Sequence, residues 1–477
     1  MTGAGVLAIL PLIIPSVAAV LLVLLISFWR NHFAAAAITL AGLALAFAAT
    51  CWRPSTDAQQ VTQLLLMDGY AAFFNGLILA AAAATVLIAY GYLRAWGGMP
   101  EEYYVLLLLA TIGSQVLVAS THLISFFIGL EILSVSLYGL TAYPRTRLVS
   151  LEAGVKYLVL AATSAAFLLF GMALVYAELG TMELGEIIRR VTTQPAGLVF
   201  SGGLALLVVG IGFKLGLVPF HLWVADVYQG APAPTTAFIA TVSKGAIFAL
   251  LVRYFVPLNA LAGEAQFWMF GVLAIASMFA GNLLALLQNN LKRMLAYSSV
   301  AHMGYLLVAF LAGGELAVTA VSFYLVAYFI TTLAAFGVIA ALSPGQREFE
   351  SLSDYEALAW RQPWTAAVLS ISLFSLAGIP LTAGFIGKFY VIAAGANVRL
   401  WALLIILVAN SAIGLYYYLR AILVMYRRPA EEQAGPAAGA APHVAARVVV
   451  SVMTVLLLWF GLYPAPLIRL IQRLAAL

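Results

Sequence analysis

An all-helical membrane protein with about fourteen transmembrane helices is the fold that the sequence predicts. Of its 477 residues, 64% are hydrophobic and only 9% are charged, and the mean hydropathy is +1.05. A soluble domain carries roughly 25% charged residues, so most of this surface must face lipid. The apolar runs are helical in length, roughly 18 to 25 residues, and only closed hydrogen-bonding patterns survive in hydrocarbon.

Polar breaks divide the chain into fourteen apolar runs. The expected spans are 6–28, 33–51, 70–93, 103–120, 122–141, 153–177, 199–228, 234–256, 267–288, 294–312, 316–342, 363–395, 400–426 and 445–465. The first run has no basic segment before it and is too long for the apolar part of a signal peptide, so it is expected to stay as a helix. The Pro/Gly/Ala-rich insert at 429–443 is expected to be a flexible loop.

Several classes of site are excluded by composition. The single cysteine, Cys51, leaves no basis for a disulfide framework or for a cysteine-ligated cluster on this chain alone. The five histidines are scattered without metal-binding spacing, and no glycine-rich nucleotide-binding loop occurs. The net charge of +5 is not clustered, so no nucleic-acid partner is expected.

Basic residues in the loops set the expected orientation, because cytoplasmic loops carry the excess of lysine and arginine. Ten such residues follow odd-numbered helices: Arg30, Arg94, Arg145, Arg147, Lys292, Arg293, Arg347, Arg361, Arg427 and Arg428. Six lie on the other side or in the tail: Arg53, Arg189, Arg190, Arg399, Arg469 and Arg473. The bias predicts that both termini face away from the cytoplasm.

Two of the runs are long and interrupted by glycine and proline. The stretch 210–221 contains Lys214 and Pro219, and the stretch 375–388 contains Pro380 and Lys388. Proline removes a backbone donor, so each helix, the seventh and the twelfth, is expected to break within the membrane. Paired broken helices of opposite direction indicate inverted repeats with a site at the midplane. Two ordinary kinked helices are the alternative.

Lysine is concentrated in the interior. Lys214, Lys244 and Lys388 fall inside apolar runs, Lys156 lies just inside another, and Lys292 is assigned to a loop. Arginine would form an ion pair equally well, but it cannot release its proton. The pKa of a lysine, by contrast, shifts readily when the residue is buried. Interior lysines therefore indicate groups that must titrate.

One carboxylate, Glu131, stands in the middle of an apolar span. A charged residue within the membrane usually has a function, so Glu131 is a candidate functional residue. The alternative is a structural ion pair between Glu131 and a lysine. Counted at about 1.5 Å per residue, these charges form a row across the middle of the protein, which suits proton transfer parallel to the membrane. His221, seven residues beyond Lys214, and His302, among hydroxyl residues, are candidates for the same relay, or structural histidines.

The residues resemble the antiporter-like subunits of respiratory complex I, and most closely the subunit N family of NADH–quinone oxidoreductase. The resemblance covers essentially the whole chain. Its matching stretches are Gly129-Leu-Glu131, Lys214-Leu-Gly-Leu-Val-Pro-Phe-His221, Asp226-Val-Tyr-Gln-Gly-Ala-Pro232, Lys292-Arg-Met-Leu-Ala-Tyr-Ser-Ser-Val-Ala-His302 and Gly378-Ile-Pro-Leu-Thr-Ala-Gly-Phe-Ile-Gly-Lys388. The M-type relative usually has glutamate in place of Lys388, and the L-type relative has a long C-terminal lateral helix that this chain has no room for. One departure is Ala225, where relatives often have proline.

This resemblance implies one polytopic domain, 1–477, with fourteen helices and inverted repeats of helices four to eight and nine to thirteen. The segments are then 1–100 (helices one to three), 101–257 (first repeat), 265–428 (second repeat) and 429–477 (loop, helix fourteen and tail). It also implies a Glu131–Lys214 pair, Lys244 as the central relay and Lys388 as the terminal lysine.

The function implied is proton translocation in the inner membrane, coupled to NADH oxidation and quinone reduction in other subunits. No cofactor is expected on this chain, while FMN, iron–sulfur clusters and quinone belong to partner subunits. The expected partners are the M-type neighbour, the small J, K and A-type subunits, the lateral helix of the L-type subunit, and the lipid bilayer. The alternatives are a subunit of a multisubunit sodium/proton antiporter and a membrane scaffold that moves no protons.

Overall fold

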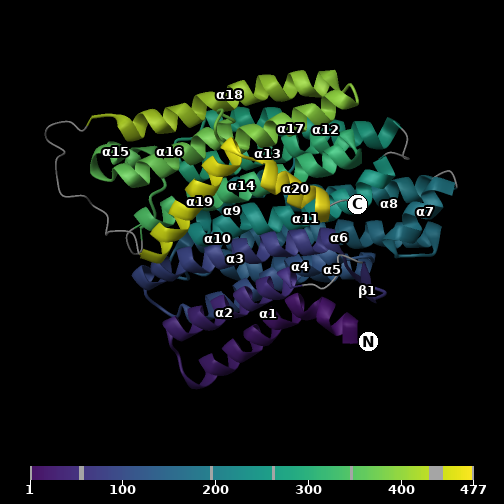
Figure 1. Ribbon diagram of the computed structural model, residues 1–477, viewed down its shortest axis with the longest axis horizontal. Helices are drawn as coiled ribbons and strands as arrows, with labels where there is room; N and C mark the ends of the chain where they lie inside the picture. The colour runs from purple at the N-terminus through teal and green to yellow at the C-terminus, as the bar shows by residue number, and fades with distance from the viewer. Residues whose placement is uncertain are drawn as a thin grey trace.

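The computed structural model describes residues 3–52, 58–193, 197–259, 264–343, 347–428 and 444–474. The insert at 429–443 therefore lies outside the described residues. Within those ranges, thirteen helices are long and apolar enough to cross a membrane, and they run side by side along the long axis of the molecule (Figure 1). A fourteenth crossing is made by two shorter helices, so the predicted fold is confirmed.

The first three membrane helices form the lower part of the bundle in Figure 1. They are α1 (Gly3–Phe28), α2 (His32–Cys51) and α3 (Gly69–Trp96). An antiparallel hairpin of β1 (Gln59–Thr62) and β2 (Leu65–Met67) precedes α3. The hydropathy pattern did not predict this hairpin, because its strands are only four and three residues long.

Five further crossings follow. They are α4 (Glu101–Ala119); α5 (Leu123–Thr141); α6 (Leu148–Leu179); the pair α8 (Leu198–Leu215) and α9 (Leu222–Gly230); and the continuous series α10 (Ala233–Phe238), η1 (Ile239–Ser243) and α11 (Lys244–Asn259). A short helix with one polar and one apolar face, α7 (Leu184–Thr193), lies between α6 and α8. It carries Arg189 and Arg190, which the hydropathy pattern predicts to lie in a loop.

The next five crossings repeat this order. They are α12 (Glu264–Leu286), α13 (Leu291–Ala312), α14 (Gly314–Leu342), the pair α16 (Pro363–Ala377) and α17 (Ala383–Asn397), and α18 (Trp401–Tyr426). A 3-10 turn, η2 (Leu352–Tyr355), and the short α15 (Leu358–Arg361) lead into α16. In both series the fourth crossing is the discontinuous one, as predicted for helices seven and twelve.

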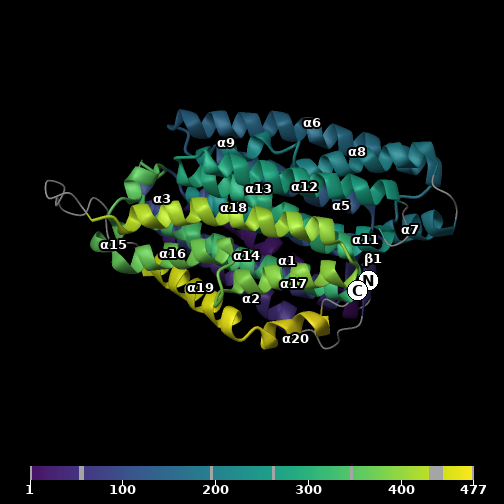
Figure 2. The same ribbon diagram turned by 90° about the horizontal axis from the view of Figure 1, so that it is seen from above.

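The last crossing is α19 (Val444–Leu462), and the amphipathic helix α20 (Ala465–Leu474) follows it. Figures 1 and 2 place the N and C labels at the same end of the molecule, where β1 and α7 also lie, whereas α15 lies at the opposite end. An even number of crossings requires this arrangement. We call the two ends the terminal face and the opposite face.

Each broken helix ends at a glycine with a left-handed backbone. Gly216, after α8, has φ of 72°, and Gly378, after α16, has φ of 84°. Glycine adopts this conformation without the steric cost that a side chain imposes. The chain then crosses a short non-helical segment before α9 or α17 begins, so backbone carbonyls are left at mid-bundle.

The two series also share a packing register. In the α4–α5 contact, a Cβ on Gly113 would lie 2.7 Å from the Gly129 carbonyl oxygen and 2.6 Å from the Leu133 nitrogen. In the α12–α13 contact, a Cβ on Gly281 would lie 2.8 Å from the Tyr297 carbonyl oxygen and 2.6 Å from the Ala301 nitrogen. In each case the glycine contacts two residues of the next helix that are four positions apart, as expected of a repeat.

This close contact generates a stability prediction. Gly113→Ala should destabilise the protein by about 1–3 kcal/mol, because the new methyl group meets backbone atoms that cannot rotate away. The control is Gly202→Ala in α8, where nothing lies within 4 Å of the added carbon. It should be neutral or stabilising, by up to about 1 kcal/mol, since alanine favours helix over glycine. Thermal unfolding in mild detergent measures both, and equal midpoints for the two variants would contradict the packing described.

Candidate functional site

Three buried lysines occupy the same kind of surroundings. Lys214, Lys244 and Lys388 are 3%, 1% and 7% exposed. Each ammonium donates a hydrogen bond of 2.6–2.7 Å to a serine hydroxyl. Each also lies 5.2–6.0 Å from the centre of a tyrosine ring. A buried cation is costly without partners, and a hydroxyl oxygen with an aromatic face offsets part of that cost without a full counter-charge.

Lys214 occupies the last turn of α8, just before the break at Gly216. Its Nζ donates to Ser134 Oγ at 2.6 Å, and that hydroxyl in turn donates to the Leu130 carbonyl at 2.5 Å. Because the serine proton points along α5, its lone pair faces the lysine. The Tyr138 ring completes the surroundings.

The expected Glu131–Lys214 ion pair is not a direct contact. Among the residues that the structure describes, no ion pair within 4 Å includes Glu131, and its buried Oε1 has no hydrogen-bond partner. Glu131 lies one turn before Ser134 on α5, and its charge acts on Lys214 over a longer distance. Ser134 fills the position closest to the ammonium, so the two charges are coupled through space.

Lys244 begins α11 directly after the π-helical turn η1. Its Nζ donates to Ser299 Oγ of α13 at 2.6 Å and lies 5.5 Å from the centre of the Tyr228 ring of α9. The Tyr228 hydroxyl is 3.2 Å from the same serine oxygen. Single π turns are often found at functional sites, where they redirect a side chain.

Lys388 lies in α17, and its ammonium reaches back to the break. Nζ donates to the carbonyl of Ala377, the last residue of α16, at 2.9 Å, and to Ser411 Oγ of α18 at 2.7 Å. A cation at the end of a half-helix is favoured by the helix dipole. A Cβ at Gly378 would lie 3.2 Å from Nζ, so the glycine also makes room for the lysine.

His302 lies in α13 between the second and third lysines. Its Nδ1 is 2.6 Å from the Tyr324 hydroxyl, and its Nε2 is 3.2 Å from the Tyr418 hydroxyl. Tyr418 also bonds Ser298, the neighbour of Ser299. The charges of both Lys244 and Lys388 act on the imidazole. From the sequence alone, His302 is placed only among hydroxyl residues in general.

A second branch of hydroxyl and amide groups leads to Lys388. The rings of Tyr417 and Tyr418 are 4.3 Å apart, and the Tyr417 hydroxyl donates to Asn282 Oδ1 at 3.0 Å. Asn282 Nδ2 donates to the Tyr305 hydroxyl at 2.9 Å, and the Tyr305 ring centre is 5.2 Å from Lys388 Nζ. Polar side chains therefore extend to the Lys388 site from Ser298, which adjoins the Lys244 partner Ser299 in the sequence.

The two remaining predicted residues lie outside this chain of contacts. His221 precedes the first turn of α9, half-buried, and its Nδ1 has no hydrogen-bond partner in the described part of the chain. Lys156 is on the outer surface of α6, where it pairs with Glu152 at 2.7 Å and with Asp226 at 2.9 Å. Asp226 also pairs with Arg293. The structure thus assigns Lys156 to a surface ion cluster, not to the buried row.

A group missed from the sequence lies on the opposite face. Lys292, assigned to a loop, is instead in the first turn of α13 and fully enclosed, paired with an equally enclosed Glu348 at 2.6 Å. Arg147 pairs with the same carboxylate at 2.8 Å. Burial opposes ionisation of Glu348, but the charges of Lys292 and Arg147 outweigh it and hold its pKa below the usual value. Hydropathy could not reveal this cluster, because its members lie far apart in the sequence.

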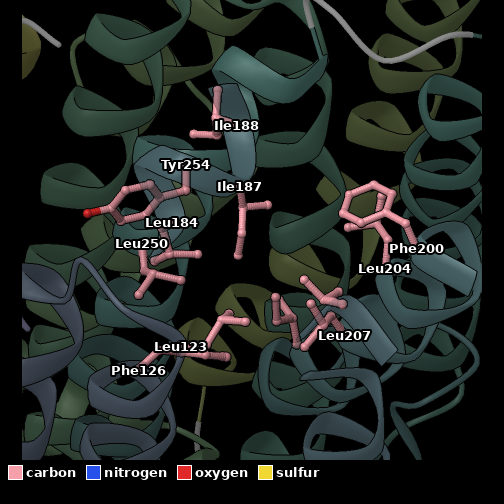
Figure 3. A pocket seen from close by; sticks show the side chains of 12 residues that line it. Leu123, Phe126, Leu184, Ile187, Ile188, Phe200, Leu204, Leu207, Leu250 and Tyr254 are labelled. Carbon is pink, nitrogen blue, oxygen red and sulfur yellow. The ribbon is translucent and has the colours of Figure 1, made fainter. Parts of the chain in front are cut away.

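An apolar cavity lies beneath α7, near the terminal face (Figure 3). Eleven of the twelve residues that line it are aliphatic or phenylalanine, and the twelfth is Tyr254. The Tyr254 hydroxyl donates to the Ser120 carbonyl instead of facing the cavity. The cavity therefore offers no group that could carry a proton. In the described residues, no cluster of three histidine, cysteine or acidic side chains could hold a metal ion.

Comparisons with known proteins agree on one family. The family model described as NADH:quinone oxidoreductase/Mrp antiporter, TM, matches residues 120–414. The NADH-quinone oxidoreductase subunit N of Methylococcus capsulatus is 46% identical over 98% of this chain and 95% of its own length. A chain of respiratory complex I from Thermus thermophilus with bound aureothin superposes with a TM-score of 0.83, at 34% identity, covering 96% of this chain and 98% of that one.

The fold is also shared with a more distant chain. A chain of the Mrp complex from Dietzia sp. DQ12-45-1b has a TM-score of 0.86 at 20% identity and covers 100% of this chain and 97% of that one. At this identity the likeness concerns the fold alone.

The serine–lysine contact can be tested by a double-mutant cycle. Ser299→Ala should destabilise the protein by about 1.5–3 kcal/mol, because it removes a hydrogen bond to a buried cation. In a Lys244→Met background the same change should cost much less, since the ammonium is gone. Ser136→Ala is the control, because the Ser136 hydroxyl donates to the Ile132 carbonyl of its own helix. Thermal unfolding in detergent measures the two single variants, the double variant and the control. If the effects of Ser299→Ala and Lys244→Met are additive, the contact contributes no stability.

Proposed function

The chain belongs to the NADH:quinone oxidoreductase/Mrp antiporter membrane family, and from that premise we propose that its buried lysines carry the translocated proton. The protein is a proton-translocating, antiporter-like subunit of NADH:quinone oxidoreductase, of the subunit N type. It is a non-redox member of the translocase, so the energy of quinone reduction must reach it from other subunits. The proposal concerns which residues of this chain use that energy.

The observation that carries the proposal is the lysine–serine–tyrosine arrangement that recurs at Lys214, Lys244 and Lys388. In the described part of the chain, none of the three ammonium groups has a carboxylate within ion-pair distance, so the loss of a proton breaks no direct ion pair. Serine hydroxyls can both accept from an ammonium and donate to a neutral amine. The arrangement therefore accommodates both protonation states, as a relay requires and a structural ion pair does not.

The proposed route runs within the plane of the bundle. A change in charge at Glu131 and Lys214 alters the proton affinity of Lys244, which passes its proton by way of Ser298, Tyr418 and His302 toward Lys388. Moving one charge against 100 mV costs about 2.3 kcal/mol, so the coupling between neighbouring charged groups must supply an amount of this order. His302, with tyrosine hydroxyls on both ring nitrogens, suits the step between the second and third lysines.

His221 and Lys156 take peripheral roles in this proposal. His221 has an unpartnered nitrogen at the break of the seventh helix, where a water molecule could connect it to Lys214. Lys156, with Asp226 and Arg293, forms a charged surface patch that could supply protons or meet a neighbouring subunit.

The assembly follows from the same premise. We assign FMN, the iron–sulfur clusters and the quinone to partner subunits. The M-type chain, the small J, K and A-type chains and the lateral helix of the L-type subunit are the proposed neighbours. The segments 101–257 and 265–428 are proposed as the two inverted repeats, between 1–100 and 429–477. A sodium/proton antiporter subunit is the second reading, but the fold likeness that favours it comes at only 20% identity.

The proposed location is the bacterial inner membrane, with both termini in the periplasm, and this orientation is testable at Cys51. This residue is exposed at the end of α2, which returns the chain to the terminal face. A membrane-impermeant maleimide applied to intact spheroplasts should modify Cys51, with the peptide identified by mass. Cys51→Ser is the control. Modification only in inside-out vesicles would reverse the proposed orientation.

The relay itself is tested by two substitutions of one residue. In the reconstituted complex, Lys244→Ala should lower the protons moved per NADH oxidised at unchanged complex abundance. Lys244→Arg should lower the ratio equally, because arginine keeps the charge but cannot release its proton. A scaffold that moves no protons predicts the reverse: Lys244→Arg behaves as wild type, and Lys244→Ala lowers abundance and activity in parallel. Unchanged proton translocation in both variants would refute the relay.

A further inference from the structure

Lys292 uses all three of its ammonium protons. Its Nζ donates to Glu348 Oε2 at 2.6 Å, to the Ala231 carbonyl at 2.6 Å and to the Gln229 carbonyl at 3.0 Å. The two carbonyls belong to the end of α9 and the residue after it. Lys292 therefore ties the first turn of α13 to the end of α9 by two backbone contacts and one charge pair.

Both partners of Lys244 are attached to these tied elements. Tyr228, whose ring faces the Lys244 ammonium, directly precedes Gln229. Ser299, which accepts the Lys244 hydrogen bond, lies seven residues beyond Lys292 on α13, about 10 Å and two turns along the same face. A shift of α9 relative to α13 would therefore separate Tyr228 from Ser299, whose oxygens are 3.2 Å apart.

Glu348 extends the tie to the helix of Lys244 itself. One of its oxygens, Oε1, accepts the backbone N–H of Ala233 at 2.8 Å, at the start of the α10–η1–α11 series. The same oxygen accepts the Tyr92 hydroxyl at 2.7 Å, and Oε2 accepts from Arg147. The three elements that carry Lys244, Tyr228 and Ser299 thus converge on one ion pair at the opposite face.

A buried ion pair of this kind is weak ground for stability, because an apolar replacement of similar volume is often neutral or better. The charged groups instead restrict the geometry, because each hydrogen bond of Lys292 and Glu348 joins two particular atoms of different elements. We propose that Lys292, together with Glu348, is a positioning residue for Lys244, holding Tyr228 and Ser299 at the distances that proton transfer through Lys244 needs. This inference rests on the proposed relay and extends it to residues outside the row.

The experiment measures protons moved per NADH in reconstituted complex carrying Lys292→Met, which keeps the chain length and removes the ammonium. The expected ratio falls by the same factor as in Lys244→Ala. Combining the two substitutions should give no further fall, because a positioning residue acts only through the residue it positions. Arg347→Met is the matched control: Arg347 is exposed on the same face and pairs with Asp354 instead of Glu348, so the ratio should not change.

A purely structural role predicts a different pattern. Complex abundance would fall, the protons moved per NADH in the assembled fraction would stay at the wild-type value, and the inference would be overturned. Because Lys292→Met leaves Glu348 with one cation fewer, Lys292→Met combined with Glu348→Gln provides a neutral version of the cluster for the same measurement. If Lys244→Ala itself leaves the ratio unchanged, the proposed relay fails. If Lys244→Ala lowers the ratio and neither Lys292 variant does, the relay stands and only the positioning role fails.

Discussion

The hydrogen bond from a buried ammonium to a serine hydroxyl is the interaction on which the interior of this protein depends. A charge in the membrane interior must be stabilised, yet a carboxylate in contact would fix the proton in place. Ser134, Ser299 and Ser411 provide an intermediate solution, supported by tyrosine rings and, at Lys388, by a carbonyl released at a helix break. The rest of the fold brings each serine hydroxyl and tyrosine ring close enough to its lysine that together they stabilise the ammonium group.

The two helix breaks and the π turn serve that purpose in different ways. The break after α16 frees the Ala377 carbonyl, which Lys388 uses directly, and Gly378 leaves room for the ammonium. The break after α8 puts Lys214 at a half-helix end, while η1 turns the chain immediately before Lys244. Irregular backbone is tolerated in a membrane only where it is enclosed by protein. Each irregularity here lies next to one of the lysines. The η1 turn is buried throughout, and the two breaks are buried at Gly216 and Thr382 but exposed at Pro219 and Leu381.

The sequence was sufficient for the number of spans, the two breaks and the three interior lysines, because these depend on local hydropathy and on the chemistry of single residues. It did not reveal the serine partners, since Ser134 and Ser299 look like ordinary helix serines until the tertiary fold faces them with lysines 80 and 55 residues away. Lys292 was misassigned for a related reason. Its polar neighbours resemble a loop, and only the distant Glu348 makes a buried position possible. The short amphipathic helices α7 and α20 were not predicted, because each is too short and too polar to form an apolar run of membrane-spanning length.

The shared register of the two repeats has an electrical consequence. Glu131 lies two residues after Gly129, which faces Gly113, and Ser299 lies two residues after Tyr297, which faces Gly281 in the same way. The position that holds an acidic side chain in one half therefore holds a neutral hydroxyl in the other. Two halves that match in shape differ in potential, so the row of lysines has a built-in polarity along the membrane plane. In the proposed relay, a carboxylate therefore acts on the proton at Lys214, whereas the corresponding position beside Lys244 offers only a neutral hydroxyl.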